Sequence, residues 1–314
     1  MSDARAAALR ARLGKNLRRL EPWARRENVS SFRVYDRDIP EVPLTIDRYQ
    51  TSQGLFVHVS VFEPRHGIAD AEVQRWADVL GAELHLDRAR VVIKRRERGG
   101  ARDKVAEQGV RQEVHEGGLR FLVNLTDYVD TGLFLDHRRL RARVREEAAG
   151  RRFLNLFSYT GSFTVYAAAG EALSSCSVDL SPTYCRWTID NLRANARPGD
   201  DPTTRHHVEP ADVFAWLERP ARDQRFDLAV LDPPTASVSR RARQSLDVHA
   251  DHPWLIERTL ERLDPGGTLY FSTNLLGFSL APPSASSVVE ITDETLSPDF
   301  SRQPPIHRCW RIVK

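Results

Sequence analysis

The stretch that decides the fold is Phe153-Leu154-Asn155-Leu156-Phe157-Ser158-Tyr159-Thr160-Gly161. Its apolar run of about five residues has the length of a strand, and the Ser-Tyr-Thr-Gly that follows is typical of a turn. Gly161 can adopt backbone angles that other residues avoid. Because residues 162–169 have helical character, we expect the first half of a βαβ unit, whose helix N-terminus points free N–H groups at whatever lies above the sheet. A nucleotide-like ligand is expected there.

The same alternation continues toward the C-terminus. Strands are predicted at 176–179, 205–209, 226–232 and 267–273, and helices at 182–195, 211–218 and 242–263. The last two strands, 288–292 and 307–313, have no clear helix between them and predict an antiparallel closing pair. Strands that alternate with helices indicate an α/β fold with a doubly wound, mostly parallel sheet.

The N-terminal third has a different pattern and predicts a smaller α+β domain. Leucines three or four residues apart predict an amphipathic helix over residues 4–27. Further elements are expected as strands 33–35, 44–47, 55–62 and 90–94 and a helix over 69–80. We therefore place one domain at residues 1–118 and a second at 119–314, which begins with a strand over 119–125.

Basic residues are concentrated in the first domain. Residues 1–118 carry 22 lysines and arginines against 18 acidic residues, whereas the remainder carries 24 against 25. Eight basic residues lie between Arg88 and Lys104, and such a run is either a solvated loop or a phosphate-contacting one. The basic surplus of the domain favours RNA binding, through a set that includes Lys94, Arg95, Arg96 and Arg98.

Composition limits the remaining classes. No apolar run reaches 18 residues and no secretory leader is recognisable, so a cytoplasmic location without a membrane span is expected. The three cysteines, Cys176, Cys185 and Cys309, are odd in number and lack metal-ligand spacing, which favours reduced thiols. The ten histidines include no His-Glu-x-x-His pattern, and we expect no metal.

Acidic residues follow successive predicted strands. Asp179 lies 18 residues after Gly161, near the spacing at which a carboxylate takes ribose hydroxyls. The turn holds one glycine where a dinucleotide motif has three, so a nucleoside without a pyrophosphate is favoured. Asp212 is expected either to accept a hydrogen bond from an adenine amino group or to cap the helix that it precedes.

Asp232-Pro233-Pro234-Thr235 follows the predicted strand over 226–232. Two prolines cannot continue a hydrogen-bonded ladder, so they predict a rigid loop that holds acceptors at the edge of the sheet. Such a loop beside a nucleoside pocket suits a second, planar substrate. Asp136 and Arg138 also follow an apolar run and are expected to cap the next helix or to reach the same ligand.

These segments resemble the class I S-adenosylmethionine-dependent RNA methyltransferases, and among them the guanine-N7 half of the bifunctional bacterial enzymes that act on 23S ribosomal RNA. The similarity covers nearly the whole chain, and the amine-directed half of those enzymes has no counterpart in it. The segments that carry it are 16–41, 123–138, 153–161, 178–179, 191–195, 226–234 and 295–310.

The resemblance implies a seven-stranded Rossmann-like methyltransferase sheet, S-adenosyl-L-methionine as the cofactor, and large-subunit rRNA or its precursor particle as the partner. It implies that Phe157, Tyr159, Thr160 and Gly161 cradle the methionine portion, that Asp179 takes the ribose, and that Asp212 takes the adenine. The full implied cofactor set is Asp136, Arg138, Asn155, Phe157, Tyr159, Thr160, Gly161, Asp179, Leu180, Asp212, Val213 and Asp232. The implied catalytic set is Asp232, Pro233 and Pro234.

The base pocket departs from the family. Ala236 and Val238 stand where a phenylalanine and an asparagine are usual, and a flipped base commonly stacks on an aromatic ring. Phe278 and Tyr159 are the candidate replacements. Because no cysteine adjoins Asp232 and guanine N7 needs no proton removed, N7 is the expected target. Amine methylation through Asp232, and a non-catalytic RNA-binding or ribosome-assembly factor, stay open as alternatives.

Overall fold

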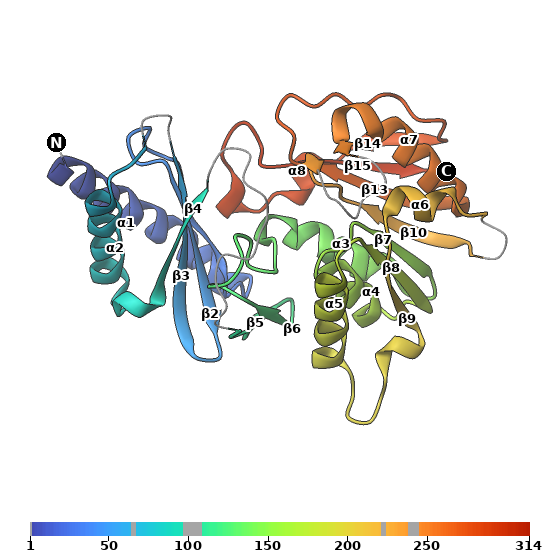
Figure 1. The fold of residues 1–314 in the computed structure, drawn as a ribbon, viewed down its shortest axis with the longest axis horizontal. Coiled ribbons are helices and arrows are strands. Elements are labelled where there is room, and N and C mark those ends of the chain that lie inside the picture. Colours follow the sequence, from blue (N-terminus) through green and yellow to red (C-terminus); the bar gives the residue numbers. More distant parts are fainter. Residues whose placement is uncertain (1, 64–66, 97–108, 221–223, 238–244) are drawn as a thin grey trace. The chain divides into compact units, whose positions relative to one another are not determined.

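The computed structural model describes residues 2–63, 67–96, 109–220, 224–237 and 245–314 (Figure 1). The chain divides into two compact units. Unit 1 comprises Met1–Leu135 and Pro298–Ser301, and unit 2 comprises Asp136–Ser297 and Arg302–Lys314. Among the described residues, no helix is both long enough and apolar enough to cross a membrane.

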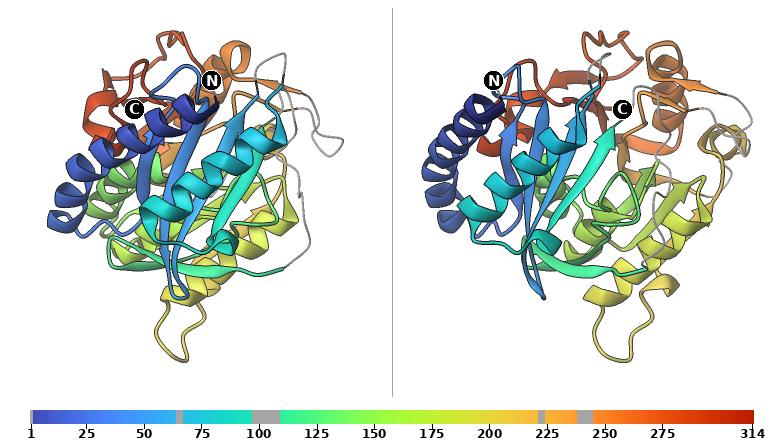
Figure 2. Two further views of the ribbon diagram at one scale, coloured as in Figure 1. Left: turned by 90° about the vertical axis from the view of Figure 1, so that its left-hand side faces the viewer. Right: turned by 60° about the vertical axis from the view of Figure 1, so that its left-hand side comes forward.

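Unit 1 is a six-stranded sheet covered by two helices. The strands are β1 (Phe32–Asp36), β2 (Leu44–Thr51), β3 (Gly54–Phe62), β4 (Val91–Arg96), β5 (Gln112–Glu116) and β6 (Leu119–Val123). They run in the order β4-β3-β2-β5-β6, with β1 also paired to β2. The helices α1 (Ser2–Arg26) and α2 (Asp70–Leu84) lie on one face (Figure 2). Leu9, Leu13 and Trp76 join the sheet's valines in one buried cluster, so the helical leucine pattern is confirmed.

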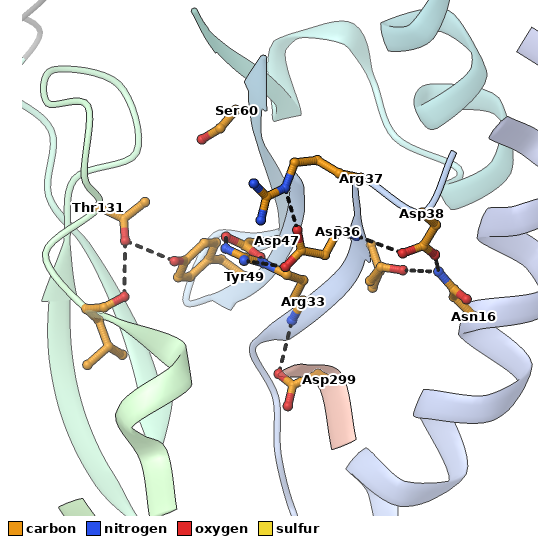
Figure 3. A network of polar contacts seen from close by, with 12 residues as sticks. Asn16, Arg33, Asp36, Arg37, Asp38, Asp47, Tyr49, Ser60, Thr131 and Asp299 are labelled. Carbon is orange, nitrogen blue, oxygen red and sulfur yellow. Dashed lines mark hydrogen bonds and ion pairs between the residues drawn. The ribbon is translucent and has the colours of Figure 1, made fainter. Parts of the chain in front are cut away.

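A buried polar network ties β1 to its neighbours in unit 1 (Figure 3). Arg33 donates from Nε and Nη2 to the two oxygens of Asp47, at 2.7 and 3.0 Å. Its backbone N–H donates to Asp299, from the segment Pro298–Ser301, at 3.2 Å. Burial raises the pKa of the Asp36 carboxyl, but the guanidinium groups of Arg33 and Arg37 outweigh it and hold that pKa below its usual value. The segment Pro298–Ser301 is thus hydrogen-bonded to β1 within unit 1.

The observed units divide later than the expected boundary at residue 118. Gly117 and Gly118 form the turn of an antiparallel hairpin between β5 and β6. Because β5 also pairs with β2, the hairpin completes the first sheet. Unit 1 therefore continues to Leu135.

Unit 2 is a seven-stranded sheet in the order β14-β15-β13-β10-β7-β8-β9. Its parallel strands are β7 (Arg152–Leu156), β8 (Ser174–Asp179), β9 (His206–Pro210), β10 (Phe226–Leu231) and β13 (Leu263–Thr273). The strands β14 (Ser287–Glu290) and β15 (Arg308–Val313) close it antiparallel. The predicted doubly wound, mostly parallel sheet is confirmed.

Helices cover both faces of this sheet. The longer helices are α3 (Arg138–Glu147), α4 (Ser162–Ala169), α5 (Pro182–Asn195), α6 (Val213–Glu218) and α7 (Val248–Glu261). The short elements are η2 (Leu135–His137), η3 (Pro202–Thr204), α8 (Thr292–Thr295) and the paired strands β11 (Ala236–Ser237) and β12 (Leu246–Asp247), and unit 1 adds η1 (Arg88–Arg90) and η4 (Pro298–Phe300).

The alternation of side chains along β7 shows why two helical layers form. Phe153 packs in the cluster that contains Leu140 of α3 and Phe163 of α4. Leu154 and Leu156 belong to the cluster that contains residues of α6 and α7. Successive strand residues point to opposite faces, so an almost continuous apolar run requires cover on both.

The strand order reverses direction between β7 and β10. From β7 the chain proceeds outward through β8 and β9, and β10 then returns to the other side of β7. In an open parallel sheet, such a switch point leaves a crevice outside the carboxyl ends of the two strands. The turn after β7 and the loop after β10 both begin there.

Candidate active site

The turn after β7 is built from unusual backbone angles. Phe157, Tyr159 and Gly161 have φ values of 55°, 51° and 74°, a left-handed region that non-glycine residues seldom adopt. The backbone N–H of Ser158 donates to the carbonyl of Val178 in β8 at 3.0 Å. Strained backbone that its surroundings hold in place is concentrated at functional sites. The turn is therefore a preformed feature of unit 2.

Helix α5 holds this turn from behind. A Cβ added to Gly161 would lie 2.2 Å from Thr188 Cγ2, so the close approach of α5 requires glycine as firmly as the backbone angle does. The Thr188 hydroxyl donates to the Tyr159 carbonyl at 3.1 Å, and Asn191 Nδ2 donates to the Thr160 carbonyl at 2.8 Å. The sequence reasoning assigned no role to Thr188 or Asn191, because helical spacing does not reveal which turn a helix contacts.

Asp179 at the end of β8 lies beside the turn. Its carboxylate accepts from the backbone N–H of Tyr159 at 2.9 Å and from that of Ser181 at 2.8 Å. Leu180, which follows it, is half-buried. The carboxylate thus links the two strand-end turns and, as an acceptor with several lone pairs, can also receive ribose hydroxyls.

Asp212 begins α6 as its N-cap. Its side chain accepts from the backbone N–H groups of Phe214 and Ala215 at 2.8 and 3.2 Å. The capping role expected of Asp212 is confirmed, whereas its contact with an adenine stays a prediction. Val213, the next residue, is buried in the core.

Asn155 lies inside unit 2, below the turn. It is 1% exposed, and its amide Nδ2 donates to Thr164 of α4 at 2.9 Å. Thr164 in turn bonds Ser177 of β8 at 2.6 Å. The side-chain amide therefore fastens α4 to the sheet, and a cofactor contact through Asn155 stays a prediction.

Asp232 follows β10 at the switch point. Its Oδ1 accepts a hydrogen bond from the Ser272 hydroxyl of β13 at 2.6 Å, and its Oδ2 lies 3.3 Å from Nε2 of His137. Pro233 is buried and Pro234 half-buried. One carboxylate oxygen thus accepts a hydrogen bond, and the other faces an imidazole nitrogen. Neither His137 nor Ser272 is predicted from the sequence as a site residue, although His137 lies between Asp136 and Arg138.

Asp136 and Arg138 make contacts within unit 2. Asp136 Oδ2 lies 2.9 Å from Nδ1 of His307, and Arg138 donates to the Ser297 hydroxyl at 3.1 Å. Both residues are only 9% exposed. Their assignment to the cofactor's amino and carboxylate ends stays a prediction.

Asp136, His137 and His307 form a buried group with metal-ligating atoms within 4.8 Å of one another. The two imidazole rings are stacked, with planes 12° apart and centroids 4.5 Å apart. Because the lone pairs of a ring nitrogen lie in the ring plane, stacked rings direct them along nearly parallel planes and not toward one ion. This geometry disfavours a shared ion, and the expectation of no metal stays a prediction.

The cysteines are buried thiols. Cys176, Cys185 and Cys309 are free and buried, and burial raises the pKa of Cys176 and of Cys185 to about 12. Burial also raises the pKa of Cys309, in β15. The thiolate is the reactive form, so none of the three is prepared to act as a nucleophile.

The expected aromatic replacements in the base pocket differ in availability. Phe278 is 1% exposed and packs among Phe271, Trp310 and His252, so it offers no free ring face to a base. Tyr159 is half-buried and lies edge-on to Tyr184, with centroids 4.6 Å apart. Ala236 is exposed, and Val238 lies outside the described residues.

Two of the basic residues expected to bind RNA are engaged within unit 1. Lys94 is buried and donates to the carbonyl of Thr126. Arg96 donates to Asp130 at 2.7 Å and to the Ser60 hydroxyl at 3.2 Å. The charge run therefore begins in η1 (Arg88–Arg90) and continues through the strand β4.

The remaining two residues of the expected RNA-binding set are Arg95 and Arg98. Arg95 forms ion pairs with Glu63 and Asp70. Arg98 lies outside the described residues. RNA binding through this set stays a prediction.

Comparison with known proteins identifies similar chains. Residues 76–282 match the family of S-adenosylmethionine-dependent methyltransferases. Ribosomal RNA large subunit methyltransferase K/L of Pseudomonas putida (strain W619) is 48% identical over 310 residues, which cover 96% of this chain and 41% of that protein. The protein of the same name from Magnetococcus marinus is 45% identical over 313 residues, with 96% and 42% covered.

Among solved structures, the crystal structure of SMU.776, a putative methyltransferase complexed with SAH, superimposes with a TM-score of 0.77. It is 22% identical, and the match covers 98% of this chain and 82% of the other. A putative methyltransferase from Streptococcus mutans gives a TM-score of 0.76 at 22% identity, covering 98% and 81%. At this identity the likeness concerns the fold.

Proposed function

Because this chain belongs to the family of S-adenosylmethionine-dependent methyltransferases, we propose that it methylates large-subunit ribosomal RNA at guanine N7. The observation that carries the proposal is the convergence of the strained turn after β7 and the carboxylate of Asp232 at one switch point of the sheet. There a bound cofactor and a base can meet.

The residues present fit the cofactor. The turn from Phe157 to Gly161 is preformed, and Asp179 and Asp212 follow the next two strands outward, as a nucleoside requires. The cofactor, when bound, supplies a methyl group on a positively charged sulfur. The role of the turn is to bind and orient that group, and the role of Asp232 is to face the base.

The RNA substrate is inferred from the relatives. Those compared above are named ribosomal RNA large subunit methyltransferase K/L, and this chain spans about two-fifths of their length. The identity of 48% extends along 96% of this chain, so it includes unit 1 as well as unit 2. Unit 1, which contains α1 with its exposed Lys15 and Arg18, is the part we expect to contact the RNA backbone.

Chemistry favours N7 among the possible target atoms. Methylation at a pyrimidine C5 would require a nucleophilic thiolate, and all three cysteines are buried thiols. Methylation of an exocyclic amine also requires a group that takes a proton, and a proton on Asp232 would compete with the Ser272 hydroxyl and the His137 ring that face its two oxygens. At N7 the ring nitrogen's lone pair forms the new N–CH3 bond while the methyl–sulfur bond breaks, and its electron pair stays on sulfur. No proton leaves the base.

Methylation of unmodified large-subunit rRNA tests the proposal. The chain is incubated with isotopically labelled cofactor and with either naked 23S rRNA or precursor particles, and the nucleosides are then identified by mass spectrometry. Labelled 7-methylguanosine, mapped by the cleavage of RNA at N7-methylated sites after reduction and aniline treatment, is the expected product.

Other labelled nucleosides, or none, would assign a different function to this chain. Labelled N2-methylguanosine would establish the amine alternative, which the presence of the Asp232 carboxylate supports. Cofactor binding by calorimetry without transfer to either RNA would establish the non-catalytic alternative, which the exposed Ala236 supports. Asp200→Ala, at an exposed acidic residue, is the control variant for the site substitutions.

A further inference from the structure

His137 occupies a distinctive position beside Asp232 in unit 2. It ends η2 and is 6% exposed, with its ring stacked on His307 and edge-on to Phe163, whose centroid is 5.6 Å away. Its Nε2 lies 3.3 Å from Oδ2 of Asp232 and 3.8 Å from Oδ2 of Asp136. One face of the imidazole is therefore stacked on His307, and Nε2 lies near two carboxylates.

The surroundings of Nδ1, the second ring nitrogen of His137, determine which nitrogen carries the proton. Nδ1 is buried and has no hydrogen-bond partner among the residues that the structure describes. Burial lowers the pKa of His137 below its ordinary value, and this effect exceeds the opposing attraction of Asp232 and Asp136. A proton on Nδ1 would be buried without an acceptor, whereas a proton on Nε2 faces carboxylate oxygens. The neutral ring with its proton on Nε2 is the form that satisfies both nitrogens best.

We propose that neutral His137 is a positioning residue, which donates its Nε2–H to Asp232 and, together with the Ser272 hydroxyl, holds that carboxylate as a fixed anion at the base site without cancelling its charge. The 3.3 Å separation is long for a hydrogen bond, and such contacts tighten when an active site binds its substrate. This inference rests on the proposed methyl transfer to guanine N7.

The value of a fixed anion at the base site follows from the change in charge on the base during that reaction. The base is neutral before transfer and carries a positive charge once its N7 has taken the methyl group, while the sulfur that loses the methyl becomes neutral. A carboxylate fixed near the base favours the charged product over the neutral reactant. A neutral donor orients Asp232 without cancelling its charge, which a lysine or arginine at the same place would do.

Protonation of His137 at Nδ1 would remove this advantage, because an imidazolium beside Asp232 makes the pair neutral. Besides burial, the charges of Asp232 and Asp136 raise the pKa of His137, and those of His307 and Arg141 lower it. Since the pKa of His137 is lowered, its ring is neutral at neutral pH and becomes charged only in acid. Methyl transfer is therefore expected to fall as the pH drops below the ordinary histidine pKa of about 6.5.

Two amide substitutions test the proposal. The side-chain N–H2 of glutamine in His137→Gln falls near the position of Nε2 and can still donate to Asp232. In His137→Asn the amide nitrogen falls near Nδ1 and cannot reach it. We expect kcat to fall roughly 10- to 100-fold in His137→Asn and to recover largely in His137→Gln, with cofactor affinity by calorimetry unchanged in both.

The pH profile gives a readout that a purely structural role would not change. The acid decline in kcat should be present in the wild type and absent in His137→Gln, because glutamine does not titrate. His249→Gln, at an exposed histidine of α7, is the matched control and should retain the wild-type profile. Equal kcat in His137→Asn and His137→Gln, or an acid decline that persists in His137→Gln, would overturn the proposal.

A measurement without RNA separates this proposal from the proposed function. Nitrogen-15 NMR of histidine-labelled protein, with the His137 signals assigned by their loss in His137→Gln, should show Nε2 protonated and Nδ1 unprotonated at neutral pH. An imidazolium or an Nδ1–H tautomer there would overturn the role of His137 even if the enzyme is active. Failure of the wild type to methylate any rRNA, with the expected tautomer present, would overturn the function and leave the protonation state of His137 established.

Discussion

Gly161→Ala tests whether the turn after β7 depends on its contact with α5. The residue has a φ of 74°, and its new methyl group would lie 2.2 Å from Thr188 Cγ2 and 2.8 Å from Thr188 Oγ1. The left-handed angle costs roughly 1–2 kcal/mol for alanine. Overpacking a filled space costs roughly 1–3 kcal/mol more. We therefore expect the free energy of unfolding of unit 2 to fall by about 2–5 kcal/mol.

Gly150→Ala is the matched control. Gly150 has a φ of 71°, and nothing lies within 4 Å of a Cβ added there, so it should show the cost of the angle without the collision. Urea unfolding followed by tryptophan fluorescence measures both, with Trp187 on α5 reporting from unit 2. Adding Thr188→Ala to Gly161→Ala should recover part of the loss. An equal loss in Gly161→Ala and Gly150→Ala would refute the role of the α5 contact.

Three further predictions concern the cofactor, the pH dependence and the RNA. Asp179→Ala should weaken cofactor affinity about 10- to 150-fold, because a hydrogen bond to a charged group contributes roughly 1.5–3 kcal/mol. Calorimetry measures the cofactor affinity, and an affinity equal to that of Asp200→Ala would refute the ribose contact of Asp179. The hydrogen bonds from Arg152 hold the pKa of Asp227 below its ordinary value, so this pair stabilises the fold above about pH 4 and the contribution is lost as the pH falls through the lowered pKa. Asp227→Asn should thus lower the free energy of unfolding by about 1 kcal/mol at neutral pH, since the pair is partly exposed, and should not change it in strong acid. A loss of stability that does not vary with pH would contradict the role of the Asp227 charge. Charge reversal at Arg95, Arg96 and Arg98 should weaken RNA binding. It should also reduce the slope of log affinity against log salt concentration by about 0.7–0.9 for each RNA phosphate that these arginines neutralise. An unchanged slope would assign RNA binding to Lys15 and Arg18 of α1 instead.

The parts of the fold that sequence predicted well are those set by local patterns. The helices over 162–169 and 182–195 match α4 and α5, because Gly161 and Pro182 mark their beginnings. The antiparallel closing pair is also confirmed in β14 and β15. In each case the decisive signal lies within a few residues of the element that it predicts.

The parts that sequence did not reveal depend on pairings between distant segments. The strand β5 has no strong alternation, and its place in the first sheet rests on pairing with β6 and β2. The segment Pro298–Ser301 joins unit 1 through Asp299, 266 positions from Arg33 in the chain. No local pattern encodes such a partner, so the pairings that extend unit 1 to Leu135 cannot be read from either segment alone.

The two halves of the candidate site differ for the same reason. The proposed cofactor half is a set of strand ends, and β7, β8 and β9 are adjacent in both chain and sheet, so its acidic residues can be predicted from their spacing. The base half is assembled around Asp232 from β13 and from η2, which lies far from it in the sequence. Spacing along the chain cannot show that a histidine at position 137 faces a carboxylate at position 232, nor that its other nitrogen is buried away from any acceptor in the described part of the chain. The choice between N7 and an amine therefore depends on the half of the site that only the tertiary structure brings together, and the protonation of His137 is the property through which that choice can be measured.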